Sequence, residues 1–166
     1  MSTATHDLPL PIRAVPAARV HVMRGVAEGF GTEFLAPVVG PLFDRLADRL
    51  IASGRWPVLP GVAVYEPDEH GEVAVTVSFA AEPDAALGPV ADQDFAVVDL
   101  PAIETAAIAV HRGHPRELDR AWAALHAAVD RQGWVQCGPA LESYECSVMV
   151  PLDQLVTQLQ LPVRRA

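Results

Sequence analysis

The feature of this sequence that most constrains its fold is an internal repeat. Residues of the first half recur 79 positions later, and one tryptophan has a near counterpart: Gly54 and Gly133, Pro60 and Pro139, Tyr65 and Tyr144, Glu66 and Glu145, and less closely Trp56 and Trp134. A unit of this size cannot bury its own hydrophobic face, so two units must pack together. The sequence therefore predicts an α+β fold of two β-α-β-β units, packed as a pseudo-twofold pair with a ligand cleft between the halves.

The hydrophobic patterns predict the elements of each unit. The first unit is expected to contain a strand over 12–23 that Pro16 interrupts and Arg24-Gly25 closes, a helix between Thr32 and Ser53 with Thr32 as N-cap, and strands over 62–66 and 73–79. The second is expected to contain strands over 95–100 and 103–110, a helix from His114-Pro115 to Gly133, and strands over 138–150 and 157–163.

The boundaries follow from these elements. Residues 1–9 are expected to form a flexible tail, and residues 10–166 a single domain. Within it we predict a first repeat over 10–80, a linker over 81–95 that is rich in proline and acidic residues, and a second repeat over 96–163.

The stretch over 138–150, GPALESYECSVMV, places a carboxylate among apolar side chains. Because successive side chains of a strand point to opposite faces, Glu142 shares its face with Tyr144, Cys146, Val148 and Val150. A carboxylate on such a face must be paired, protonated or available to a ligand. Two interpretations follow: Glu142 is held in the core by an arginine or by Tyr144, or it recognises a ligand in the cleft.

The repeat makes Glu142 an asymmetric feature. Tyr144 corresponds to Tyr65, whereas Glu142 corresponds to Ala63, so the cleft is aromatic on both sides and acidic on one. The small side chain of Ala63 leaves room opposite the acid. Such a cleft suits a planar cation or a polycyclic aromatic molecule, through stacking, cation–π attraction and charge pairing. The candidate ligand-binding residues are Glu142, Tyr144, Tyr65, Ala63, Trp134 and Trp56.

The aromatic residues also have structural interpretations. Tyr65 and Tyr144 can be core residues with hydrated hydroxyl groups, and Trp122, on the apolar stripe of the second helix, is expected in the core rather than in a pocket. Trp56 and Trp134 follow helix ends, where each can cap the core or shelter a cleft.

Composition and charge argue against several functional classes. All 12 basic residues are arginines, and 21 acidic residues give a net charge of -9, so the basic stripe that nucleic acid requires is absent. No apolar run approaches the ~20 residues of a membrane helix, and the N-terminus lacks a secretory signal pattern, so we expect a cytoplasmic protein without membrane contact. Cys137 and Cys146 form no metal-binding or disulfide pattern, and no metal or cofactor is expected.

Short motifs follow one another along the second half of the chain: Leu100-Pro101-Ala102, His111-Arg112-Gly113, the helix ending at Gly133, Gly138-Pro139, Glu142-x-Tyr144 and Pro162-Val163, with looser matches in the first half at Val15-Pro16-Ala17, Arg24-Gly25 and Tyr65. In this order they resemble the GyrI-like effector-binding domain family, also found as the drug-sensing part of MerR-type and AraC-type regulators. The resemblance implies a duplicated, SHS2-type fold, a central glutamate at Glu142, and binding of bulky, often cationic, aromatic compounds, with a role in antibiotic resistance.

The resemblance leaves three functions open. The first is a stand-alone domain, without a DNA-binding part, that sequesters or senses aromatic and preferably cationic compounds. The second, implied by one subgroup of the family, is a hydrolase of cyclopropane-bearing electrophilic natural products, in which Glu142 is the general base. The third is a modulator of an unknown protein partner, such as a gyrase inhibitor.

Overall fold

The computed structural model describes residues 9–145 and 150–166. Cys146 and Val148, which the sequence assigns to a strand, lie outside the described residues, as does most of the expected tail. In chain order the elements are β1 (Ile12–Val15), β2 (Ala18–Ala27), α1 (Thr32–Ala52), β3 (Gly61–Pro67), β4 (Val73–Ala80), β5 (Gly88–Pro89), β6 (Ala96–Leu100), β7 (Ile103–Arg112), η1 (Pro115–Glu117), α2 (Leu118–Arg131), β8 (Trp134–Gln136), β9 (Ala140–Tyr144), η2 (Leu152–Gln154) and β10 (Val156–Arg165).

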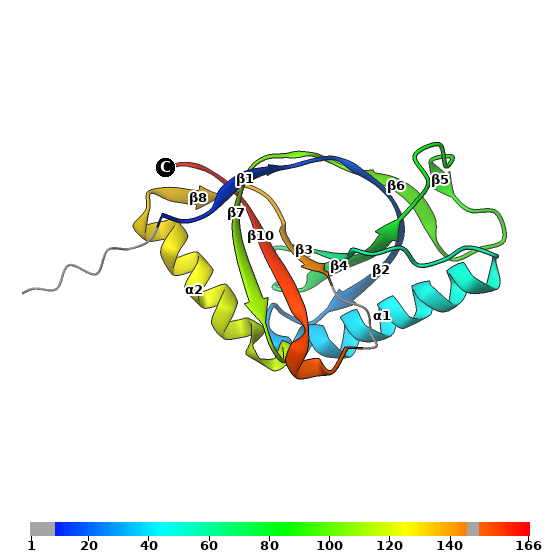
Figure 1. Cartoon of the computed structure of the whole chain (residues 1–166), viewed down its shortest axis with the longest axis horizontal. Coiled ribbons are helices and arrows are strands. Elements are labelled where there is room, and N and C mark those ends of the chain that lie inside the picture. The colour runs from blue at the N-terminus through cyan, green and yellow to red at the C-terminus, as the bar shows by residue number, and fades with distance from the viewer. Residues whose placement is uncertain (1–8, 146–149) are drawn as a thin grey trace, which may run out of the picture.

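The ten strands of the described residues form an antiparallel sheet. Their order is β1-β7-β10-β9-β3-β4-β2-β6-β5, and β8 pairs with the end of β10. Both helices lie on the same side of this sheet, below it in Figure 1. The predicted α+β class, with helices packed against an antiparallel sheet, is therefore confirmed.

The two halves of the sheet meet at β3 and β9. Ala63 lies opposite Glu142, Tyr65 opposite Ala140, and Gly61 opposite Tyr144. A twofold axis that relates residues 79 positions apart would preserve this register. It would exchange Ala63 with Glu142 within their pair, and it would exchange the pair of Tyr65 and Ala140 with the pair of Gly61 and Tyr144. The repeat and its boundaries stay a prediction, and the observed register is the one that such a repeat requires.

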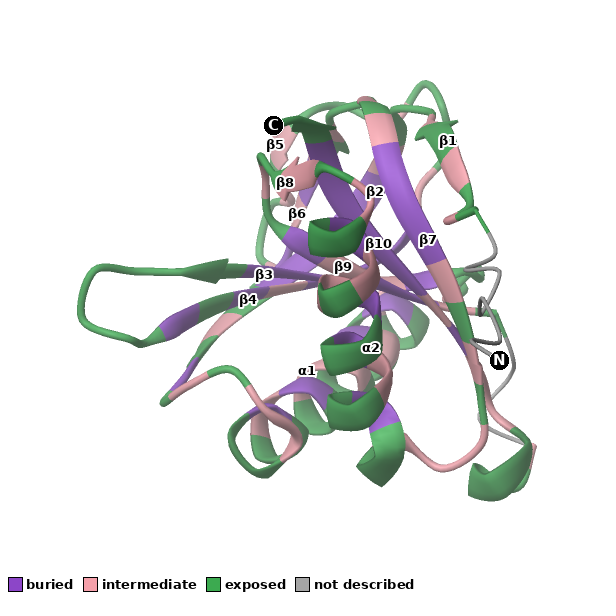
Figure 2. Ribbon diagram, turned by 90° about the vertical axis from the view of Figure 1, so that its left-hand side faces the viewer, coloured by how far each residue is buried: buried purple, intermediate pink, exposed green. Residues whose placement is uncertain are grey.

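Each helix packs on strands of its own half of the sheet. α1 packs on β2 and β4, and α2 packs on β7 and β8. The buried positions of α1 are Leu35, Val39, Leu46 and Leu50, and those of α2 are Leu118, Trp122, Leu125 and Val129. Figure 2 shows these buried stripes turned toward the strands, where most of the other buried residues lie. The arrangement leaves the space over the central pair, β3 and β9, open between the helices.

The predicted end of β2 at Arg24-Gly25 is wrong. The strand continues to Ala27, and Gly25 pairs with Val75 inside the ladder. A Cβ atom at Gly25 would lie 2.9 Å from Cδ1 of Leu42, so the glycine lets α1 approach the sheet rather than making a turn.

The predicted N-cap of the first helix is also wrong. The N-cap is Gly31, and Thr32 is the first helical residue. The backbone N–H of Thr32 and its hydroxyl both donate to Oδ1 of Asp119, at 2.9 and 2.8 Å. The carboxylate of α2 thus satisfies a free N–H at the start of α1. This contact holds together the first turns of the two helices, which meet at the bottom centre of Figure 1.

Other differences concern strand lengths. β9 ends at Tyr144 rather than at Val150, and Trp134–Gln136 forms a strand, β8, that the sequence does not predict. Both faces of β9 are buried, since Ser143 is as buried as Glu142. The predicted linker over 81–95 contains β5 and is tied to α1, because Asp94 pairs with Arg45 at 2.7 Å and with Arg49 at 3.2 Å.

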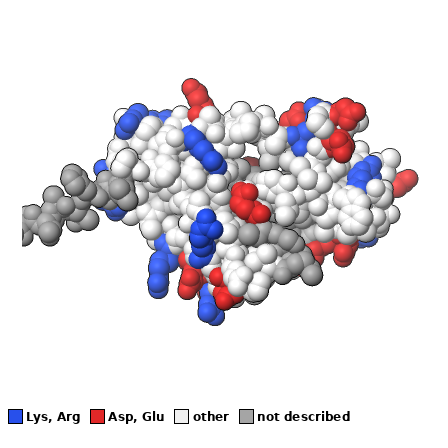
Figure 3. All heavy atoms as spheres, viewed as in Figure 1, with Lys and Arg blue, Asp and Glu red and all other residues white. Residues whose placement is uncertain are grey.

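The surface and the helices bear on possible partners. On the face drawn in Figure 3 the arginines are dispersed among acidic side chains and form no continuous basic stripe. Neither helix of the described chain is long and apolar enough to cross a bilayer.

Candidate functional site

A cavity of about 370 Å³ lies over the central strands, between the two helices. One stripe of α1 forms a wall: Thr32, Leu35, Ala36, Val39, Gly40, Phe43 and Asp44. The opposite wall comes from α2, and β3, β4 and β9 supply the base. The helices pack mainly on other strands of the sheet, and the cavity occupies the space between them.

Glu142 lies at the base of this cavity and is 3% exposed. Its carboxylate accepts two hydrogen bonds: Nε1 of Trp122 donates to Oε1 at 3.2 Å, and the hydroxyl of Tyr144 donates to Oε2 at 2.8 Å. Within the described chain no arginine contacts this carboxylate. Of the two core partners that the sequence suggested, an arginine and Tyr144, the structure has Tyr144.

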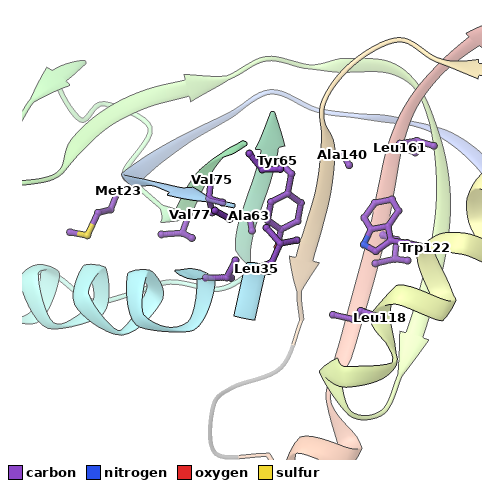
Figure 4. Close-up of a cluster of buried hydrophobic side chains, with 14 of the residues drawn as sticks. Met23, Leu35, Ala63, Tyr65, Val75, Val77, Leu118, Trp122, Ala140 and Leu161 are labelled. Carbon is purple, nitrogen blue, oxygen red and sulfur yellow. The ribbon is translucent and has the colours of Figure 1, made fainter. Parts of the chain in front are cut away.

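A chain of hydrogen bonds extends from Glu142 to the first half of the molecule. The hydroxyl oxygens of Tyr65 and Tyr144 lie 3.3 Å apart. Because Tyr144 donates its single proton to Glu142, it accepts from Tyr65. Both predicted tyrosines therefore orient the carboxylate, one directly and one through its neighbour. Figure 4 shows Tyr65 from β3 and Trp122 from α2 on opposite sides of β9.

The buried cluster shifts the protonation equilibria of its members. Burial raises the pKa of Glu142 above its ordinary value of 4.5, while the hydrogen bonds from Tyr144 and Trp122 act in the opposite direction. Burial and the negative charge of Glu142 raise the pKa of both tyrosines well above 10.0, so they keep their protons and remain donors. The base of the cavity is therefore a carboxyl group whose ionised form is disfavoured by burial.

Aromatic rings line the cavity on two sides. Phe30, in the loop before α1, meets Tyr65 edge to face at 5.7 Å and Trp122 at 5.9 Å between ring centroids. Phe43 of α1 meets Tyr144 at 5.4 Å in the same geometry. Phe30 is 42% exposed, so its ring forms part of the cavity mouth.

The charges of the cavity are all negative. Besides Glu142, the lining contains Asp119 at the start of α2 and Asp44 on α1. None of the described lining residues is an arginine or a histidine. The negative charge of Asp119 also contributes to the raised pKa of Glu142.

The structure brings together only some of the predicted site residues. Glu142, Tyr144 and Tyr65 line the cavity, and Ala63 is fully buried opposite Glu142 in the sheet without lining it. Trp56 and Trp134 do not line it. Trp56 is 76% exposed beyond the end of α1, and Trp134 belongs to β8, where the Arg165 guanidinium lies 3.8 Å from its ring centroid. A position after a helix end does not fix the direction of a side chain.

Two important residues were missed by the sequence reasoning, Trp122 and Phe30. Trp122 was assigned to the core, and it is indeed buried, but it also donates to Glu142. The offset of 79 residues aligns Trp122 with Phe43, which packs on Tyr144. This alignment of two aromatic residues could have indicated that both lie near the central strands. Phe30 carried no such signal, since it lies in a loop without a counterpart.

No group of three histidine, cysteine, aspartate or glutamate residues that could hold a metal ion occurs in the described ranges. The described lining of the cavity supplies a carboxyl group, hydroxyl and indole donors, and aromatic rings.

No protein-family model and no curated protein matches the sequence, whereas solved structures do. The C-terminal domain of EcmrR is similar with a TM-score of 0.70 and 19% identity over 95% of this chain and 98% of that one. SAV2435, solved bound to tetraphenylphosphonium, is similar with a TM-score of 0.64 and 11% identity, over 95% of this chain and 94% of that one. A hydrolase from Listeria innocua is similar with a TM-score of 0.56 and 14% identity, over 92% of this chain and 91% of that one. At these identities the likeness establishes the fold.

The raised pKa of Glu142 predicts that Glu142→Gln stabilises the protein without ligand at neutral pH. A carboxyl with a folded-state pKa above its unfolded value favours folding below about 4.5, and this contribution is lost as the pH rises through the folded pKa. Chemical unfolding at pH 7.5 should give a higher midpoint for the variant, and the difference should shrink toward pH 4.5. Glu66→Gln, at an exposed position of β3, is the control and should show no such pH dependence. A less stable Glu142→Gln at pH 7.5 would contradict this account.

Proposed function

We propose that this protein, which has the fold of a GyrI-like effector-binding domain, binds bulky aromatic cations in the cavity over Glu142. The observation that carries the proposal is the buried carboxylate at the base of an aromatic cavity whose described lining is free of basic residues. The protein would thereby sequester or sense such compounds, and a cytoplasmic location remains part of the proposal.

The energetics of Glu142 support a cationic ligand. Its charge is desolvated and only partly compensated by two hydrogen bonds, so a cation entering the cavity gains an attraction that water screens only weakly. The faces of Tyr65, Trp122 and Phe30 add cation–π attraction and area for stacking. An anion would meet three carboxylates instead. The cation bound to SAV2435 belongs to the same ligand class.

Charge selectivity is tested with two ions of the same shape, tetraphenylphosphonium and tetraphenylborate. Calorimetry should detect binding of the phosphonium cation and none of the borate anion. Glu142→Gln should lower the affinity for the cation by roughly 10- to 150-fold, which corresponds to the loss of a charged contact of about 1.5–3 kcal/mol. Equal binding of both ions, or an affinity that Glu142→Gln leaves unchanged, would refute the role of the carboxylate.

The aromatic wall predicts an effect of Phe30 that Trp56 does not share. Phe30→Ala should lower the affinity for tetraphenylphosphonium by roughly 2- to 10-fold, because it removes one aromatic contact of about 0.5–1.5 kcal/mol. Trp56→Ala is the matched control, an exposed aromatic residue outside the cavity, and should bind as the unchanged protein does. A larger loss in Trp56→Ala than in Phe30→Ala would place the ligand elsewhere.

A hydrolase is the second candidate function, and the raised pKa of Glu142 favours it. A buried carboxyl with hydrogen-bonded oxygens and a raised pKa has the properties of a general base that activates water. The Listeria innocua structure of the same fold is described as a hydrolase. Incubation with a cyclopropane-bearing alkylator, followed by mass spectrometry, should yield many water adducts per protein, and Glu142→Gln should yield none. Recovery of unchanged compound would leave binding as the function.

A further inference from the structure

The three carboxylates of the cavity lie in a definite order along it. Asp119 is bonded to Thr32, at the first turn of α1. Trp122, one turn further along α2, reaches Glu142, which Tyr144 also contacts. Phe43 packs on Tyr144 and is followed by Asp44. The sequence of contacts therefore places Asp119 at one end of the cavity, Glu142 between, and Asp44 toward the other end.

The rise of the helix sets the length of this row. Thr32 and Asp44 both line the cavity from α1, and at 1.5 Å per residue they are separated by roughly 18 Å along the helix axis. This length exceeds that of a compact aromatic ion. A ligand that fills the cavity from end to end is elongated.

The two terminal carboxylates differ in availability. Oδ1 of Asp119 already accepts two hydrogen bonds from Thr32. Asp44 is exposed, and it has no hydrogen bond or ion pair with any residue in the described ranges. A second positive group would therefore gain most near Asp44, whose carboxylate lines the cavity without a partner among the described residues.

Small side chains leave the path to Asp44 open. Ala36 and Gly40 of the lining stripe are exposed, and a Cβ atom at Gly40 would meet nothing within 4 Å. An alkyl chain can pass along this side of α1 without displacing a large side chain.

From this arrangement we infer that the cavity is built for an elongated dication: an aromatic cation over Glu142 that carries a second cationic group on a short chain reaching Asp44. The inference rests on the proposed binding of aromatic cations and adds the second charge. The cavity itself is the site, and Asp44 decides which of its cationic ligands bind best.

Ethidium and propidium provide a matched test, because they share one aromatic cation and propidium adds a quaternary ammonium on an alkyl chain. Fluorescence titration at low salt should show that propidium binds about threefold to fivefold more tightly, the range of an exposed ion pair. Asp44→Asn should abolish this advantage, so that the two dyes bind with about equal affinity. Asp48→Asn, an exposed position of α1 outside the cavity, should retain it. Added salt should reduce the advantage.

The outcomes separate this inference from the proposed function. If ethidium binds with an affinity that depends on Glu142, while propidium binds no more tightly or keeps its advantage in Asp44→Asn, the dication inference alone is overturned. If neither dye binds, the proposed function fails as well. Ethidium binding that is retained in Asp44→Asn also verifies that the variant is folded.

Discussion

The buried carboxylate of Glu142 is the constraint on which the rest of the site depends. A carboxyl group that is 3% exposed needs hydrogen-bond partners within the protein. The indole of Trp122 comes from α2, the hydroxyl of Tyr144 from β9 itself, and Tyr65 supports that hydroxyl from β3. One charge thus ties the second helix to the central strands of both halves, and the same charge forbids a dry apolar layer from closing over it.

The cavity follows from how the helices divide the sheet. α1 packs mainly on β2 and β4, α2 packs mainly on β7 and β8, and Phe43 and Trp122 reach from the helices to the β3–β9 pair. The contact between Thr32 and Asp119 joins the helices at their first turns. Gly25 draws α1 onto the sheet by allowing Leu42 to pack against the strand. The space over Glu142 is therefore a consequence of how the helices pack on the neighbouring strands.

The sequence predicted those features that depend on local pattern or on the repeat. Period-two alternation and the offset of 79 residues identified Tyr65, Tyr144 and Glu142, because a strand fixes which face a side chain occupies. The side-chain direction of a residue after a helix end follows no such alternation, and Trp56 and Trp134, which were expected in the cleft, lie outside the cavity. Trp122 was assigned by its helical stripe to the core, and only the approach of α2 to β9 gives its indole a partner. The contact of Phe30 with two rings depends on a loop path that no pattern encodes.

The pairing of Ala63 with Glu142 explains why the site is asymmetric although the strand order is not. The two residues are directly opposite in the central ladder, where Cβ atoms are about 4.5–5.5 Å apart. Two carboxylates at this distance would repel each other in a buried site, and one of them would have to take up a proton. The central pair can therefore hold only one buried charge. With Ala63 opposite, Glu142 has no second acid beside it, and the small side chain leaves space next to its carboxyl group.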